Sequence, residues 1–214
     1  MTVGESESEV TWYPRNLAVG EKGTPKIYQF LSEAFSETQN FRYAEFGFYR
    51  AATALTVAKR FPKAELHLFD YSQAVEAARL KFAELPNRVF FYSSTERYLD
   101  SYNWPLVQLL SQQAGAPLFD YCFLDGAHTF AVDALTFFLA DRLLNVGGYL
   151  DFDDYRWRLR GSSLDPERVP QTSLMYTEEQ IDTYQVALIV EELVRRDPRY
   201  VEVMPNKVFR KVSN

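Results

Sequence analysis

Apolar positions along residues 24–214 follow two alternating patterns, and each pattern predicts a different element. Short compact apolar runs such as 119–124 are typical of buried strands. Between these runs, apolar residues recur at helical spacing, as Ile27, Leu31 and Phe35 do, which indicates amphipathic helices. The predicted strands are 43–47, 65–69, 88–92, 119–124, 149–152, 200–204 and 207–212; the predicted helices are 24–37, 51–61, 73–85, 102–113, 131–144 and 178–196, with a brief one capped by Thr95.

The order of these elements predicts the fold class. Five strand-helix units followed by a hairpin turned at Pro205 and Asn206 are typical of an α/β fold. We expect a doubly wound, Rossmann-like, seven-stranded sheet, mostly parallel, with an antiparallel C-terminal hairpin and helices on both faces. Residues 24–214 should form this single domain and residues 1–23 a flexible N-terminal arm. The irregular segment 155–177 should be a loop that covers the substrate.

Composition and charge restrict the partners. The 214 residues carry a formal net charge of −6 and a sequence pI near 5.1. Nucleic-acid-binding domains usually present a basic face, so the charge argues against nucleic acid. No secretory signal and no membrane-spanning apolar stretch is visible, and the single cysteine, Cys122, excludes an internal disulfide. We therefore expect a soluble cytoplasmic protein with no membrane partner.

Polar side chains follow every predicted parallel strand, where ligands of doubly wound sheets bind. Asp70, after the second strand, is placed to accept the hydroxyls of a ribose, although it could also be a helix N-cap. The loop after the first strand has Gly47 but no G-x-G-x-x-G fingerprint for a pyrophosphate. A ligand without phosphates needs a less close backbone approach, which favours an adenosyl-amino acid over NAD.

Acidic residues gather after the fourth and fifth strands. Asp125, Asp153 and Asp154 should converge on one point of the cleft, and an all-oxygen set of carboxylates suits Mg²⁺, Mn²⁺ or Ca²⁺. His128, three residues after Asp125, is suited to act as a base near neutral pH, or makes a structural hydrogen bond. Asp151 interrupts an apolar strand. It should therefore either lie beside the site and support the residues there, or form an ion pair with a nearby arginine. His67 and Cys122 are interpreted as core residues.

These motifs resemble a known family. Glu45-x-Gly47, the acid Asp70 and the runs 119–128 and 147–155 are similar to class I S-adenosylmethionine-dependent methyltransferases, most of all to the branch of macrocin-type sugar O-methyltransferases and cephalosporin-hydroxylase-like proteins. One departure is Ala51, where this loop commonly carries glycine. The resemblance implies an S-adenosylmethionine (AdoMet) site at Glu45, Gly47, Phe48, Asp70, Tyr71, Ser94, Thr95 and Asp125. It also implies a divalent metal, most simply Mg²⁺, at Asp125, Asp153 and Asp154, with His128 and Asp125 as the catalytic pair.

The expected function is therefore metal-assisted O-methylation of a small-molecule hydroxyl, sugar or diol-like, with His128 taking the proton. Three alternatives stay open: a metal-independent methyltransferase, a non-catalytic AdoMet-binding protein, and an NAD-binding oxidoreductase. The side chains expected to flank the acceptor are Tyr155, Arg156, Trp157, Arg158 and Arg160. The N-terminal arm and helix 24–37 are candidates for a homodimer contact.

Overall fold

The computed structural model describes residues 25–97 and 99–214. The predicted arm at residues 1–23 and the first residue of the helix predicted at 24–37 lie outside the described residues. The strands are β1 (Arg42–Phe46), β2 (Glu65–Tyr71), β3 (Val89–Ser94), β4 (Phe119–Leu124), β5 (Leu144–Phe152), β6 (Tyr200–Met204) and β7 (Val208–Lys211). The helices are α1 (Pro25–Ala34), α2 (Ala52–Arg60), α3 (Ser72–Phe82), α4 (Asn103–Gln112), α5 (Phe130–Leu143), α6 (Thr172–Met175), α7 (Glu178–Asp182), α8 (Gln185–Ile189) and the π-helical η1 (Val190–Val194).

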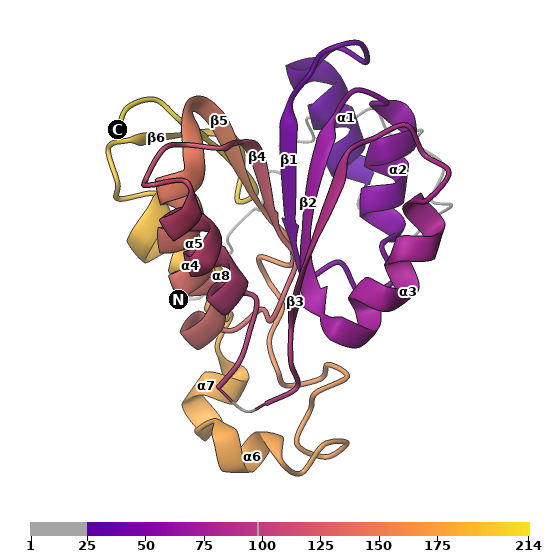
Figure 1. The fold of residues 1–214 in the computed structure, drawn as a ribbon. Helices are drawn as coiled ribbons and strands as arrows, with labels where there is room; N and C mark the ends of the chain where they lie inside the picture. The colour runs from indigo at the N-terminus through magenta and orange to yellow at the C-terminus, as the bar shows by residue number, and fades with distance from the viewer. Residues whose placement is uncertain (1–24, 98) are drawn as a thin grey trace.

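The strands form one seven-stranded sheet in the order β3-β2-β1-β4-β5-β7-β6. The pairs among β1 to β5 are parallel, and β7 runs antiparallel to β5 and β6. Helices α1, α2 and α3 lie on one side of the sheet, and α4, α5 and α8 on the other (Figure 1). The predicted doubly wound sheet with its antiparallel hairpin is confirmed.

Alternating side chains of the strands build a core on each face of the sheet. In β1, Tyr43 belongs to the core under α1 to α3, whereas Ala44 and Phe46 belong to the core under α4, α5 and α8. Both faces of β1, β2 and β4 are covered, which explains why most of their side chains are apolar. Burying both faces leaves only the ends of the strands for polar chemistry.

The prediction of one long helix at 178–196 is wrong. Three shorter pieces, α7, α8 and η1, replace it, because the backbone turns to extended angles at Thr183 (ψ 140°) after α7. The capping box of Thr177 and Gln180 starts α7, as expected for such a pair. The periodic spacing of apolar residues continues across the break, which is why the sequence pattern alone did not reveal it.

Two other boundaries differ from prediction. Gly147 and Gly148 do not close the helix before them but lie inside β5, which begins at Leu144. At Gly148, a Cβ would approach the carbonyl oxygen of Asp120 to 2.9 Å, so glycine permits the close approach of β4 there. Of the described residues between Thr95 and α4, none is helical; the Thr95 backbone N–H and hydroxyl both donate to the carboxylate of Asp100. The segment 155–177 is irregular as predicted, apart from the single turn of α6.

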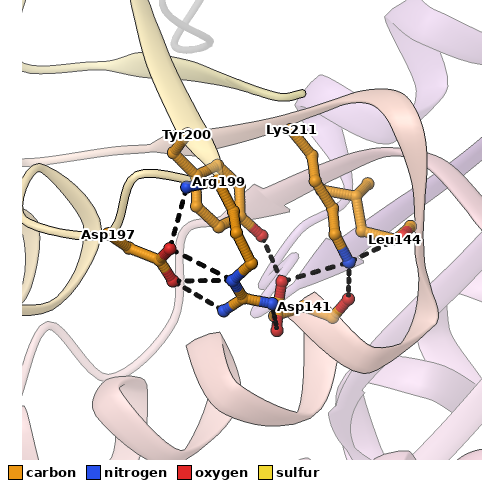
Figure 2. Close-up of polar contacts among 6 residues, drawn as sticks. All are labelled: Asp141, Leu144, Asp197, Arg199, Tyr200 and Lys211. Atoms are coloured by element: carbon orange, nitrogen blue, oxygen red, sulfur yellow. Dashed lines mark hydrogen bonds and ion pairs between the residues drawn. The ribbon is translucent and has the colours of Figure 1, made fainter. Parts of the chain in front are cut away.

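A buried ion-pair network ties the C-terminal hairpin to the end of α5 (Figure 2). The Asp141 carboxylate accepts hydrogen bonds from Arg199 (2.9 Å) and from the Tyr200 hydroxyl (2.6 Å), and lies 3.2 Å from the Lys211 ammonium. Arg199 also pairs with Asp197. Burial alone would raise the pKa of Asp141, but these partners hold that pKa below its usual value.

The variant Asp141→Asn is expected to lose about 3–5 kcal/mol of unfolding free energy at pH 7, because the buried Lys211 loses its counter-charge. A carboxyl whose pKa is lowered by folding stabilises the protein above its unfolded pKa, and this stabilisation is lost as pH falls through the folded pKa. The difference from wild type should therefore shrink below about pH 4. Urea unfolding at both pH values tests this, with Asp182→Asn as the exposed ion-pair control.

Candidate functional site

The carboxyl ends of the parallel strands meet at one edge of the sheet, beyond which the segment with α6 and α7 lies (Figure 1). Phe46 of β1 is in register with Phe69 of β2 and with Leu124 of β4. Two further backbone bonds extend these ladders: the Asp125 N–H donates to the carbonyl of Phe46, and the Asp153 N–H donates to the carbonyl of Leu124. The sheet thus brings the loops after β1, β2, β4 and β5 to the same edge.

Asp70 organises the loop after β1. One of its carboxylate oxygens accepts hydrogen bonds from the backbone N–H of Phe48 (2.8 Å) and of Tyr49 (2.6 Å). The other accepts one from the backbone N–H of Tyr71 (2.7 Å). Asp70 lies within β2, and Tyr71 occupies the N-cap position of α3. The N-cap interpretation of Asp70 is therefore wrong, while its remaining lone pairs can still accept hydrogen bonds from hydroxyl groups.

The other residues predicted to bind the cofactor differ in what they present at this edge. Ser94 is buried at the end of β3, 3.5 Å from the Asp70 carbonyl oxygen, and Tyr71 is about half exposed beside it. Phe48, in contrast, points its ring into the core against Phe91, so it offers the edge only its backbone. Thr95 holds the loop after β3 through Asp100.

Backbone strain concentrates at this edge. Six residues other than glycine have positive φ in the described chain, and four of them lie in the loops after β1, β4 and β5: Tyr49 (46°), Ala51 (59°), His128 (54°) and Asp154 (55°). Each costs about 1–3 kcal/mol and persists where the surroundings over-determine it, which happens most often at functional sites. At Ala51, the left-handed conformation explains why glycine is common at this point of the loop.

Glu45 is the most deeply buried acid of the edge. It lies on β1 and accepts a hydrogen bond from the Tyr43 hydroxyl at 2.8 Å. Burial, together with the nearby Asp70 and Asp153, raises its pKa to about 8 against the opposing effect of the Tyr43 hydrogen bond. Its carboxyl therefore holds its proton to a higher pH than a solvent-exposed glutamate does.

The structure brings Asp125, Asp154 and His128 together, as predicted. The Nε2 atom of His128 lies 3.8 Å from Asp125 and 3.6 Å from Asp154. Burial, together with Asp153, Glu45 and Asp154, raises the pKa of Asp125 to about 9. Burial and Asp153 also raise the pKa of Asp154. These mutual effects mean that the carboxylates repel one another and that a cation at this edge would be stabilised.

Asp151 finds a partner that sequence reasoning missed. Fully buried on β5, it forms an ion pair of 2.7 Å with Lys207 and accepts a 2.5 Å hydrogen bond from Tyr121. The Lys207 ammonium also lies 3.5 Å from Asp153. The sequence left open a role beside the site and an ion pair with a nearby arginine; the partner is instead Lys207 of the hairpin, which no local pattern connects to Asp151.

The side chains expected to flank the acceptor have different roles. The Trp157 ring lies 5.2 Å from the His128 ring, so it does border the site. Arg160, however, pairs with Glu178 and Asp182 and holds the segment 155–182 together. The Arg158 guanidinium lies over the Tyr184 ring, 5.5 Å from its centroid.

Two kinds of feature, a ready metal site and a membrane-spanning helix, are absent from residues 25–97 and 99–214. No group of three or more His, Cys, Asp and Glu side chains is arranged there as a ready metal site. Within the same residues, no helix combines the length and the apolar character needed to cross a bilayer.

Comparisons with known proteins bear on the fold. No family model matches the chain, and no curated protein matches it. Among solved structures, a provisionally assigned O-methyltransferase from Klebsiella pneumoniae matches with a TM-score of 0.57 at 16% identity, over 92% of this chain and 84% of that one.

Two further structures match at similar strength. A provisionally assigned caffeoyl-CoA O-methyltransferase from Staphylococcus aureus gives a TM-score of 0.52 at 13% identity, over 87% and 81% of the two chains. The MycE methyltransferase of the mycinamycin biosynthetic pathway, in complex with Mg and SAH, gives 0.51 at 18% identity, over 88% of this chain and 48% of MycE. This chain therefore spans about half the length of MycE. At these identities the likeness concerns architecture, and the chain has the fold of class I S-adenosylmethionine-dependent methyltransferases.

Proposed function

We propose that this protein is an AdoMet-dependent methyltransferase that transfers a methyl group to a hydroxyl of a small molecule. The observation that carries the proposal is the gathering of acids at the carboxyl edge of the sheet: Glu45, Asp70, Asp125, Asp153 and Asp154. AdoMet brings two positive groups, a sulfonium and an ammonium, which relieve the repulsion among these carboxylates. A pyrophosphate would add to that repulsion, so the acids oppose the NAD alternative.

The residues assigned to the cofactor follow from where the acids lie. Asp70 accepts a ribose hydroxyl with the lone pair that its three backbone partners leave free. Tyr71, Ser94 and Thr95 border the adenosine, and the loop of Gly47 and Phe48 presents its backbone to it. Glu45 and Asp125, deeper at the edge, face the cationic methionine part.

The chemistry assigned to the site is an in-line displacement at the methyl carbon. His128 accepts the proton of the attacking hydroxyl; the new C–O bond forms as the C–S bond breaks, and its electron pair stays on sulfur to give S-adenosylhomocysteine. Asp125 and Asp154, each within 4 Å of the His128 Nε2 atom, stabilise the imidazolium that results. The segment 155–177, with Trp157 against His128, covers the acceptor.

A divalent metal is part of the proposal. Hard carboxylate oxygens are the ligands that Mg²⁺ prefers, and Asp125, Asp153 and Asp154 would hold it. Such an ion, when bound, lowers the pKa of the acceptor hydroxyl. Likeness to MycE, solved with Mg and SAH, favours this arrangement. The second candidate is a metal-independent enzyme, favoured by Lys207, whose ammonium already lies beside Asp153 as well as Asp151 and occupies part of the space where a cation would bind.

Calorimetric titration of AdoMet into the purified protein tests the proposal. Wild type should bind, and Asp70→Ala should bind about 10–100-fold more weakly, because it loses charge-assisted hydrogen bonds worth about 1.5–3 kcal/mol. Glu76→Ala, an exposed acid on α3, is the matched control and should bind as wild type does. Because Asp70 also holds the loop after β1, a thermal melt of Asp70→Ala must show that the variant is folded.

The outcomes separate the alternatives. Absence of AdoMet binding together with binding of NAD would refute the methyltransferase assignment. Turnover of a panel containing a sugar, a catechol and a hydroxy acid is then followed with Mg²⁺ and with EDTA. Activity lost in EDTA and restored by Mg²⁺ supports the metal, whereas activity that resists EDTA supports the metal-independent candidate. AdoMet binding without any turnover would favour a non-catalytic binding protein.

A further inference from the structure

Residues 125–128 form the turn between β4 and α5 and carry Asp125 and His128, the acid and the base of the site. Two buried side chains hold this turn in place. Tyr102 precedes α4, and Asp133 lies in the first turn of α5; both are buried. The Tyr102 hydroxyl donates a hydrogen bond to the Asp133 carboxylate. Neither residue was recognised as relevant to the site from the sequence.

Both side chains contact the backbone of the turn. The Ala127 N–H donates to the Tyr102 hydroxyl oxygen at 3.0 Å, and that hydroxyl is in turn fixed by its own hydrogen bond to Asp133. The backbone N–H groups of Ala127 and His128 also oppose the rise in the pKa of Asp133 that burial causes. Tyr102 and Asp133 thus form a clamp on the turn, and the Ala127 N–H keeps its partner only while this clamp is in place.

Close packing keeps the same turn in one position. A Cβ at Gly126 would lie 2.2 Å from the Tyr102 hydroxyl oxygen, so only glycine fits beneath the ring. On its other side, Gly126 packs against Gly47, where a Cβ would lie 2.4 Å from the Gly126 Cα. The turn is therefore enclosed between Tyr102 and the loop after β1.

The clamped backbone is strained at the residue that carries the base. His128 adopts a φ of 54°, in the left-handed region. This conformation directs the ring to a place where Nε2 lies within 4 Å of both Asp125 and Asp154 and the ring faces Trp157. A turn in an unstrained conformation would not need two buried polar partners to hold it. The clamp therefore accounts for how the strained conformation of His128 is maintained.

We propose that Tyr102 and Asp133 are positioning residues that fix the turn 125–128, so that His128 and Asp125 stay in the geometry required for proton removal from the acceptor. They do not touch the substrate; they act through the backbone of Gly126 and Ala127, which the Tyr102 ring and hydroxyl contact. The catalytic consequence rests on the proposed function, whereas the effect on the orientation of His128 does not.

The experiment compares Tyr102→Phe with wild type by NMR of the histidine rings. The chain has only two histidines, His128 and His67, so each ring signal is readily assigned and His67 serves as the internal reference. Wild type should show nuclear Overhauser contacts between His128 and the Trp157 indole. In Tyr102→Phe these contacts should be lost while the His67 signals stay unchanged.

The matched control is Tyr92→Phe, because Tyr92 hydrogen-bonds the ring of His67 at 2.9 Å. This variant also removes one tyrosine hydroxyl, but it should shift His67 and leave the His128 contacts and turnover unchanged. Turnover of Tyr102→Phe should fall about 10–100-fold, since a displacement of about 1 Å can cost that much. Its AdoMet affinity should stay within about threefold of wild type, a split that a loss of stability alone would not produce.

Asp133→Asn provides a second variant if Tyr102→Phe does not fold. It keeps the volume of the side chain but presents an amide nitrogen among the N–H donors of the turn, so the same losses are expected. Unchanged His128 contacts and unchanged turnover in either folded variant would overturn the proposal. A wild-type protein that binds no AdoMet would refute the proposed function instead, and the ring contacts would still decide whether the clamp orients His128.

Discussion

Replacing His128 by alanine is expected to lower kcat by about 10²–10⁴-fold, the usual contribution of a general base, while AdoMet affinity changes little. The reason is geometric: the His128 imidazole lies at this edge, and its Nε2 atom is within 4 Å of the carboxylates of Asp125 and Asp154. The measurement is the rate of S-adenosylhomocysteine formation at saturating AdoMet with the best acceptor from the panel. Calorimetry on the same sample reports the affinity.

The control for this prediction is His67→Gln. His67 is buried and hydrogen-bonds Glu65 and Tyr92, far from the carboxyl ends of the strands, so its replacement should lower stability but not kcat. A folded His128→Ala enzyme that turns over at the wild-type rate would remove His128 from the mechanism. The proton would then have to leave through Asp125 or directly to water.

Lys207→Met is expected to lower the unfolding free energy by about 3–5 kcal/mol at pH 7, because it leaves the fully buried carboxylate of Asp151 without a counter-charge. Adding Asp151→Leu should recover most of the loss, since a buried ion pair can often be replaced by packed apolar side chains at little cost. Denaturant unfolding of the single and double variants gives the measurement. Lys81→Met, which removes an exposed lysine, should change stability by less than about 0.5 kcal/mol.

The pH dependence gives a second check on the same pair. Burial raises the pKa of Asp151, and Lys207 and Tyr121 oppose the rise. Without Lys207 the folded pKa rises further, so the folded variant keeps its proton at pH values where the unfolded chain has lost it. Stability of Lys207→Met should therefore increase as the pH is lowered toward the unfolded pKa near 4. If Lys207→Met loses less than about 1 kcal/mol of unfolding free energy at pH 7, Asp151 is already protonated in the native protein.

The polar ends of the strands were predictable because they depend on local patterns. Apolar runs mark β1, β2 and β4, and in a parallel sheet the residues that follow them must meet at one edge. Asp70, Asp125 and His128 could therefore be placed at that edge from their positions along the chain alone. The ribose role of Asp70 and the metal role of the acids stay predictions.

The break between α7 and α8 could not be predicted in the same way. The apolar residues Ile181, Val186 and Ile189 keep a spacing compatible with one helix, and all three are buried. The extended residue Thr183 interrupts the helix only because the chain must both hold the segment 155–182 and return along the sheet. Tertiary packing overrode a local pattern that favoured a single helix.

The α/β class, the closing hairpin and the acidic edge were predictable from the sequence, because each follows from short-range periodicity and from the residues directly after a strand. The partners of those acids depend on the packing of the folded chain. Lys207 of the hairpin reaches Asp151 on β5, and Tyr102, just before α4, reaches Asp133 on α5. Contacts between residues so far apart depend on how the layers pack, and no local pattern of hydrophobic and polar positions encodes them.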